Sequence, residues 1–254
     1  MTERGAAPPI EGSAPDVAEA SAFAAEERRI LDEYRRRAGI DRERDDPANP
    51  SALYIRSSRA RAAARALADT GKFPRRGDPC LEIGCGSLGW LADLLSWRLR
   101  EADLHGLELD PARAAIAKES FPAADIRAGD AASLPWEPDR FALVVASTLF
   151  SSILDEVMRR AVAAEIWRVL RPGGALLWYD LRVDNPSNPN VRGFQRSEIR
   201  ALFPHLSEAT LRSTTLVPPL IRMLAGRARL AAELLEAIPP LRTHYVGVFV
   251  KGER

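Results

Sequence analysis

Residues 81–90 read LEIGCGSLGW and place Gly84, Gly86 and Gly89 in the spacing G-x-G-x-x-G, directly after a short apolar run. An apolar run followed by this spacing predicts a buried strand, a tight turn and the start of a helix. Glycine is needed in such a turn because the backbone comes closer to a ligand than a Cβ atom allows. Since several nucleotide-binding classes share the spacing, its meaning depends on the residues around it.

The rest of the chain after this loop alternates between short apolar runs and helical patterns, which indicates βαβ units and a parallel sheet. We expect strands at 79–83, 103–109, 125–127, 141–147, 174–180, 209–217 and 244–251. We expect helices at 88–99, 111–119, 156–170 and 196–203, with a helical insertion at 219–237 that forms a core or dimer contact.

The first 72 residues have a different character. Residues 1–15 are rich in Pro, Gly and Ala, and we predict a disordered tail there. Residues 16–72 are expected to form an N-terminal helical cap from two amphipathic helices, joined by a polar linker at 41–51. Residues 73–254 then form the main domain.

Composition limits the classes of partner. Lys and Arg number 36 against 35 Asp and Glu, so the net charge of +1 gives no global attraction to nucleic acid or to an anionic membrane. No apolar run approaches the ~20 residues of a membrane helix, and the N-terminus lacks a signal-peptide pattern. Cys80 and Cys85 fit no zinc spacing and no disulfide framework. We therefore expect a cytoplasmic protein with no catalytic metal, no nucleic-acid partner and no membrane partner.

Two carboxylates follow the next two expected strands. Glu108 ends the second strand, where a carboxylate can accept both ribose hydroxyls of a nucleoside, and Asp130 follows the third, where it can accept from an adenine amino group. The alternatives are a surface glutamate and a loop-capping aspartate. Because parallel strands end at one edge of a sheet, we expect both side chains beside the glycine loop.

With these residues on the page, the chain resembles the class I S-adenosylmethionine-dependent methyltransferases, of a bacterial type that acts on small molecules or glycans. The resemblance covers about residues 78–180 and rests on the glycine loop, Glu108, GDAASLPW at 129–136 and LRPGG at 170–174. It implies an α/β fold with a Rossmann-like seven-stranded, mostly parallel sheet, helices on both faces and the N-terminal helical cap. Ala142 departs from the family's usual Asp, at a position that is more structural than catalytic.

The resemblance also implies S-adenosylmethionine as the cofactor and a set of contacts to it. The glycine loop lines the methionine end, Glu108 holds the ribose, and the third strand's end flanks the adenine. The complete expected set is Glu82, Gly84, Cys85, Gly86, Glu108, Leu109, Asp130, Ala131 and Ser147.

A base for the acceptor is the least determined part of the site. Methyl transfer is an in-line displacement, and an alcohol acceptor usually needs a base within hydrogen-bond reach. Asp180 ends the fifth strand, and the family's antiparallel last strand would start with His244 at the same edge. We predict that Asp180 orients His244 as the base. The alternative is a packed histidine and a loop-capping aspartate.

The predicted function is therefore methylation of a small-molecule, sugar or natural-product acceptor, at oxygen. N- or C-methylation and a catalytically silent cofactor-binding scaffold remain alternatives, and a homodimer is left open. A nicotinamide dehydrogenase shares the loop, but not the Asp130 motif or LRPGG. A nucleic-acid base methyltransferase would carry Asn/Asp-Pro-Pro-aromatic where residues 147–150 read STLF.

Overall fold

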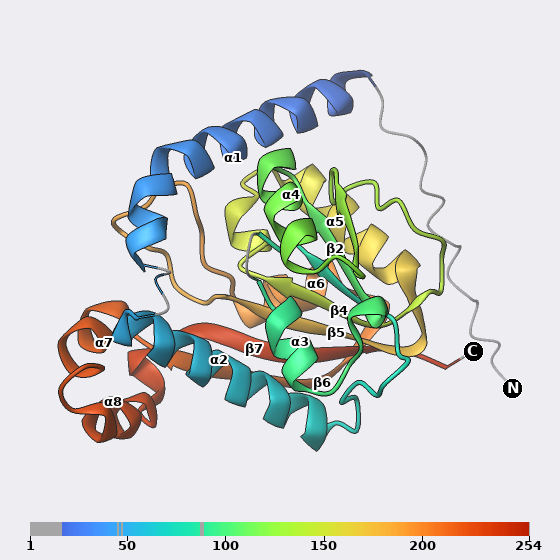
Figure 1. Cartoon of the computed structure of the whole chain (residues 1–254). Helices are drawn as coiled ribbons and strands as arrows, with labels where there is room; N and C mark the ends of the chain where they lie inside the picture. The colour runs from blue at the N-terminus through green and yellow to red at the C-terminus, as the bar shows by residue number, and fades with distance from the viewer. Residues whose placement is uncertain (1–16, 45, 47, 87–88, 254) are drawn as a thin grey trace, which may run out of the picture.

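The computed structural model describes residues 17–44, 46, 48–86 and 89–253, so the tail predicted at 1–15 lies outside it. Across these residues, seven strands form one sheet in the order β3-β2-β1-β4-β5-β7-β6 (Figure 1). The strands are β1 (Cys80–Ile83), β2 (Leu104–Glu108), β3 (Asp125–Ala128), β4 (Phe141–Ser147), β5 (Leu170–Leu181), β6 (Leu206–Leu216) and β7 (Arg242–Lys251).

The helices of the same residues alternate with these strands. They are α1 (Val17–Arg44), α2 (Pro50–Asp69), α3 (Leu91–Ser96), α4 (Pro111–Ser120), α5 (Glu156–Val169), α6 (Arg196–Leu202), α7 (Pro218–Leu224) and α8 (Arg229–Glu236). Short 3-10 helices are η1 (Glu101–Asp103), η2 (Phe150–Ser152) and η3 (Pro239–Leu241). None of the helices in the described ranges is long and apolar enough to span a bilayer.

The strand pairing confirms a mostly parallel sheet. Strands β1 to β5 pair in parallel, and β7 runs antiparallel between β5 and β6. The chain moves from β1 outward to β3 and then returns to place β4 on the other side of β1. Such a reversal leaves a crevice beyond the carboxyl ends of β1 and β4, where ligands bind in open α/β sheets.

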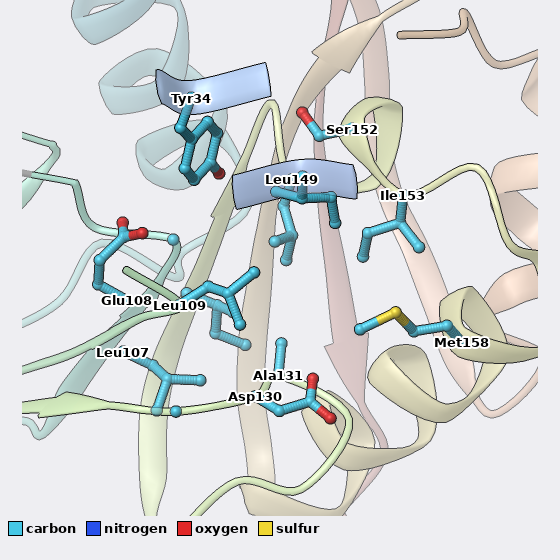
Figure 2. Close-up of a pocket in the computed structure, with 14 residues that line it drawn as sticks. Tyr34, Leu107, Glu108, Leu109, Asp130, Ala131, Leu149, Ser152, Ile153 and Met158 are labelled. Atoms are coloured by element: carbon cyan, nitrogen blue, oxygen red, sulfur yellow. The ribbon is translucent and has the colours of Figure 1, made fainter. Parts of the chain in front are cut away.

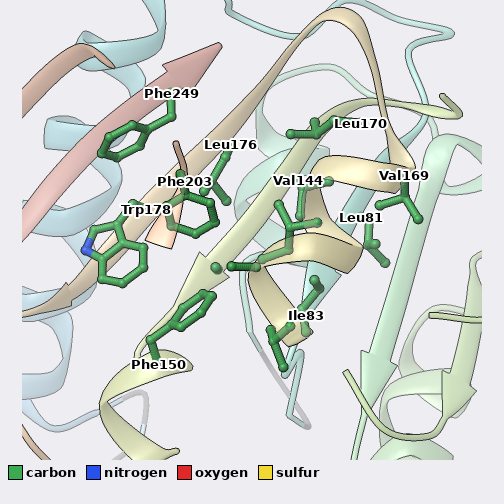
Figure 3. Close-up of a cluster of buried hydrophobic side chains, with 14 of the residues drawn as sticks. Leu81, Ile83, Val144, Phe150, Val169, Leu170, Leu176, Trp178, Phe203 and Phe249 are labelled. Carbon is green, nitrogen blue, oxygen red and sulfur yellow. The ribbon is translucent and has the colours of Figure 1, made fainter. Parts of the chain in front are cut away.

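Helices cover both faces of the sheet. On one face, α5 and α6 pack over a cluster that includes Phe150, Trp178 and Phe249 (Figure 3). On the other face, α2, α3 and α4 bury small and apolar side chains against the strands. Strands β1, β2, β4, β5 and β7 thus contribute side chains to both cores, which keeps the strand ends in fixed positions.

Several helix boundaries differ from those expected. Helix α3 is shorter than 88–99, because Arg98 takes a left-handed φ of 72° that ends the helical path. The insertion at 219–237 is two helices, α7 and α8, separated by a turn that contains Gly226. Both ends of the polar linker expected at 41–51 belong to helices. Helix α1 extends to Arg44, and α2 begins at Pro50, where the Asn49 side chain accepts from the backbone amide of Ser51.

Only α1 of the expected helical cap lies over the strand ends (Figure 1). Helix α2 instead packs on the sheet, because Ala63 and Ala66 let it approach closely while Leu67 fills the core. The domain boundary at residue 72 stays a prediction, but α2 contributes to the same core as β7 and β5.

Candidate active site

A cavity of about 450 Å³ lies beyond the carboxyl ends of β1, β2 and β3 (Figure 2). Its lining joins α1, the three strand ends and the segment after β4: Ile30, Tyr34, Ile83, Gly84, Leu107, Glu108, Leu109, Gly129, Asp130, Ala131, Leu149, Ser152, Ile153 and Met158. The structure therefore brings the two sequence-predicted carboxylates to one apolar-walled space.

Glu108 ties the glycine loop to the start of α4. Its buried carboxylate accepts hydrogen bonds from the backbone amides of Gly86, at 2.7 Å, and Asp110, at 3.1 Å. Each carboxylate oxygen can accept further bonds from a ligand in the cavity. Gly86 has φ of 57°, a left-handed backbone conformation that favours glycine, and a Cβ there would lie 2.6 Å from the movable end of the Arg113 side chain.

Asp130 caps a loop and also lines the cavity. Its Oδ1 accepts from the amide of Ala132 at 2.9 Å, which caps the loop, and the residue also lines the cavity. Glu27 of α1 hydrogen bonds to the same carboxylate, and burial together with the charge of Asp130 raises the pKa of Glu27. An acceptor for an adenine amino group is thus available at this end.

Glu82 and Cys85 lie beneath the loop rather than in the cavity wall. Glu82 accepts from the amide of Trp90 at 2.7 Å, and burial raises its pKa to about 8. A Cβ on Gly89 would lie 2.3 Å from this carboxylate, so the loop has no space for a side chain there. The thiol of Cys85 packs near Gly106, and burial raises its pKa. Contact of either side chain with the cofactor stays a prediction.

A second, more polar cleft of about 1,220 Å³ opens to solvent next to the first cavity. The two share the wall residues Ile30, Tyr34, Gly84, Leu149 and Ser152. The cleft adds hydrogen-bonding groups from the ends of β4 and β7 and from the loop after β5: Ser147, Thr148, Ser151, Asn185, Asn188, Asn190 and His244. Ser147 therefore lines this cleft and not the first cavity, and its contact with the cofactor stays a prediction.

Comparison with known proteins identifies this arrangement. Residues 80–174 match the family model described as a methyltransferase domain. This match covers less than half of the chain. A solved S-adenosylmethionine-dependent methyltransferase from Methanosarcina mazei has a similar fold, with a TM-score of 0.54 at 16% identity over 72% of this chain and 97% of that one. The matched domain and this fold agree with the S-adenosylmethionine cofactor expected from the sequence.

Curated relatives match part of this chain. Phthiotriol/phenolphthiotriol dimycocerosates methyltransferase 1 of Mycobacterium ulcerans is 38% identical over 111 residues, which cover 43% of this chain and 40% of the relative. A sterol 4-C-methyltransferase of Caenorhabditis elegans is 36% identical over 110 residues, which cover 40% of this chain and 30% of the relative. The match thus spans less than half the length of either relative.

The Asp180–His244 pair expected from the sequence is not formed. In the β5–β7 register, Leu181 stands opposite His244 and Asp180 opposite Tyr245, so the two side chains point to opposite faces of the sheet. Asp180 accepts from the amides of Ser151, at 3.1 Å, and Leu181, at 2.8 Å. Burial raises its pKa to about 6. Asp180 therefore caps the loop after β4, which was the alternative stated for it.

His244 does line the polar cleft. Its ring stacks on Tyr179 at 4.8 Å, and Nδ1 lies 3.0 Å from Thr243 Oγ1. Burial lowers its pKa to about 4, so the imidazole is neutral at neutral pH. In the described residues, no cluster of three or more side chains could hold a metal ion.

Sequence reasoning missed the contribution of α1 to the site. Tyr34 lines both cavities, and the Arg113 guanidinium lies 4.4 Å from its ring centroid. Burial and the nearby Glu108 raise the pKa of Tyr34 to about 12. The only signal was the helical spacing of Ile30 and Tyr34, which indicates a buried face but not what that face covers.

Proposed function

We propose that this chain transfers the methyl group of S-adenosylmethionine to an oxygen of a small-molecule acceptor bound in the polar cleft. The shared wall of the two cavities carries this proposal, because an in-line displacement needs donor and acceptor to meet through one opening. Gly84 lies at that junction with φ of 74°, so bare backbone borders the point of transfer.

The residues present fit the parts of the cofactor. Glu108 would accept from the ribose hydroxyls, Asp130 from the adenine amino group, and the backbone at Gly84 would border the methionine end. When bound, S-adenosylmethionine supplies a methyl group that is already activated on a sulfonium. The chain's own part is to align the acceptor, and apolar Ile30 and Leu149 exclude water from the junction.

His244 supports an oxygen acceptor. It is neutral at neutral pH. Thr243 Oγ1 donates to the Thr215 carbonyl at 3.3 Å, so His244 Nδ1 donates to Oγ1, and in this tautomer Nε2 can accept a proton from a hydroxyl. A weak base is sufficient here, because a hydroxyl oxygen becomes strongly acidic as it gains the methyl group. Asp180 acts as a positioning residue, since its bonds to the Ser151 amide hold the segment that borders the cleft.

The cleft lining also supports a hydroxyl-bearing acceptor. Its asparagine and serine groups suit a sugar or another hydroxylated natural product, and the relatives' names add lipid acceptors to the candidates. A carbon acceptor is the second candidate function, because one relative is named as a 4-C-methyltransferase. A cytoplasmic location is part of the proposal and is supported by two buried free thiols, Cys80 and Cys85.

Titration calorimetry with S-adenosylhomocysteine and with NAD tests the cofactor assignment. We expect binding of the first and none of the second; the reverse would replace the methyltransferase with a dehydrogenase. Transfer of labelled methyl to a panel of phenols, sugars, lipid hydroxyls, amines and carbon acids tests the acceptor, with the product position read by NMR. Cofactor binding without any turnover across the panel would favour the silent scaffold.

Replacement of His244 with Asn tests the base. We expect kcat to fall about 100-fold or more while affinity for S-adenosylhomocysteine is kept, because a general base contributes ~10²–10⁴-fold. His205→Asn is the matched control, since His205 is exposed. Normal kcat in His244→Asn would remove the base from the proposal.

A further inference from the structure

The hairpin of α7 and α8 carries an unusual share of the exposed apolar surface. Of the eight large hydrophobic side chains that are exposed in the described residues, four fall between residues 223 and 238. They are Met223 at 55%, Leu230 at 77%, Leu234 at 73% and Ile238 at 45% exposure. Single exposed hydrophobics are ordinary, but a cluster marks a site of interaction.

Three of the four lie close together along the chain. Leu230 and Leu234 are four residues apart and share one side of α8, and Ile238 lies in the turn that follows the helix; these three side chains are called the apolar row. The opposite side of α8 is anchored: Glu236 accepts from Tyr54 Oη at 2.6 Å and from the Thr215 amide at 2.9 Å. The row therefore stands on a fixed support at one end of the molecule (Figure 1).

The hairpin carries three arginines and two glutamates, so its net charge is positive. Arg222, Arg227 and Arg229 are exposed, and the first two form no ion pair within the part of the chain that the structure describes. Both acidic residues of the hairpin are engaged, because Glu233 pairs with Arg229 at 3.1 Å and Glu236 anchors α8. Apolar side chains flanked by arginines match the interface of an anionic bilayer.

We propose that the α7–α8 hairpin docks the protein on an anionic lipid surface, with Leu230, Leu234 and Ile238 entering the headgroup region. A second copy of the chain fits this surface less well, because a two-fold interface would bring the arginines of both copies together. The inference goes beyond methyl transfer and differs from the expectation of no membrane partner. Pro218, at the start of α7, lines the acceptor cleft, so docking would bring the cleft mouth near the lipid.

Sedimentation with sucrose-loaded vesicles tests the proposal on the full chain without cofactor, so the result does not depend on the methyltransferase assignment. We expect binding to phosphatidylcholine vesicles that contain phosphatidylglycerol, and little binding to phosphatidylcholine alone. Leu230→Glu with Leu234→Glu should weaken the partition coefficient at least tenfold. Arg222→Ala with Arg227→Ala should weaken it about fivefold for each arginine.

The matched control is Ile116→Glu with Val157→Glu, which makes the same charge change at side chains that are 50% and 46% exposed on α4 and α5. Circular dichroism melting confirms that each variant is folded. Kept binding in the control and lost binding in the α8 variant would support the proposal. Absent binding, equal binding to neutral vesicles, or unchanged binding of the α8 variant would overturn it. A dimer that the α8 variant dissociates, without vesicle binding, would assign the surface to a second copy.

Discussion

Glu108 has two roles at the cavity beyond β1, β2 and β3. Its carboxylate accepts hydrogen bonds from the backbone of Gly86 and Asp110, and the residue also lines the cavity. In Glu108→Gln, the amide NH2 would have to face one of two backbone donors, at Gly86 or Asp110. A hydrogen bond to a charged group is worth about 1.5–3 kcal/mol, so we expect affinity for S-adenosylhomocysteine to fall roughly 10- to 100-fold. Titration calorimetry measures this change.

The control for this variant is Glu119→Gln, which removes the same charge from an exposed position on α4. It should bind S-adenosylhomocysteine as the parent chain does. Equal affinity in Glu108→Gln and Glu119→Gln would contradict the assignment of the ribose site. A melting curve separates lost binding from lost folding.

The alternation of side chains between the two faces of a strand explains which site residues could be located from the sequence. Glu108 and Asp130 follow adjacent strands, and the edge at which a parallel strand ends is enough to locate them. Asp180 and His244 also share an edge, but a pair needs the same face as well. A shift of one residue in the pairing of two strands moves a side chain to the opposite face of the sheet relative to its partner. No local pattern in the sequence fixes the register of β5 against β7.

Helix α1 is the element that closes the site, and Glu26 holds it there. The carboxylate accepts from Arg29 Nε at 2.8 Å and from the backbone amides of Leu154 and Asp155. Burial alone would raise the pKa of Glu26, but these hydrogen bonds lower it overall. One side chain thus joins α1 to the segment after β4 that borders both cavities.

Glu26→Ala should release α1 while the sheet stays folded. Leaving buried donors unpaired costs about 1–3 kcal/mol, which corresponds to a fall of roughly 5- to 150-fold in amide protection along α1. Hydrogen exchange measured by mass spectrometry reports this directly. Asp32→Ala serves as the control, because Asp32 lies on the same helix and is 71% exposed. Unchanged protection in Glu26→Ala would show that other contacts hold α1.

The elements differ in how far the sequence predicts them. The start of α4 was readable because Asp110 and Pro111 cap it locally, with the Ala112 amide 2.8 Å from Asp110 Oδ1. The position of α1 was not, because Glu26 meets a partner 128 residues away. The break between α7 and α8 lies in a window whose apolar spacing is continuous, so periodicity alone hid it.

At the scale of the whole fold, Glu82, Asp180 and His244 are three of the described groups whose shifted pKa values make stability depend on pH. The pKa of Glu82 is raised to about 8 and that of Asp180 to about 6, so the folded state holds more protons than the unfolded state between the ordinary carboxyl range and those values. The pKa of His244 is lowered to about 4, so the folded state holds fewer protons up to about pH 6.5. The first two groups lower stability as pH rises, and His244 opposes them.

Between about pH 6.5 and 8 Glu82 is the one of these three groups whose raised pKa lies inside the window, while Asp180 and the unfolded-state histidine finish titrating there. The free energy of unfolding should therefore fall between about pH 6.5 and 8, by at most about 1.4 kcal/mol per pH unit for Glu82. In Glu82→Gln the amide cannot ionise, so the curve should fall less steeply over this window while Glu119→Gln keeps the parent slope. Urea unfolding at half-unit pH steps measures both. A parent curve that rises or stays level would mean that Glu82 is ionised beneath the loop, ready for a cationic cofactor group.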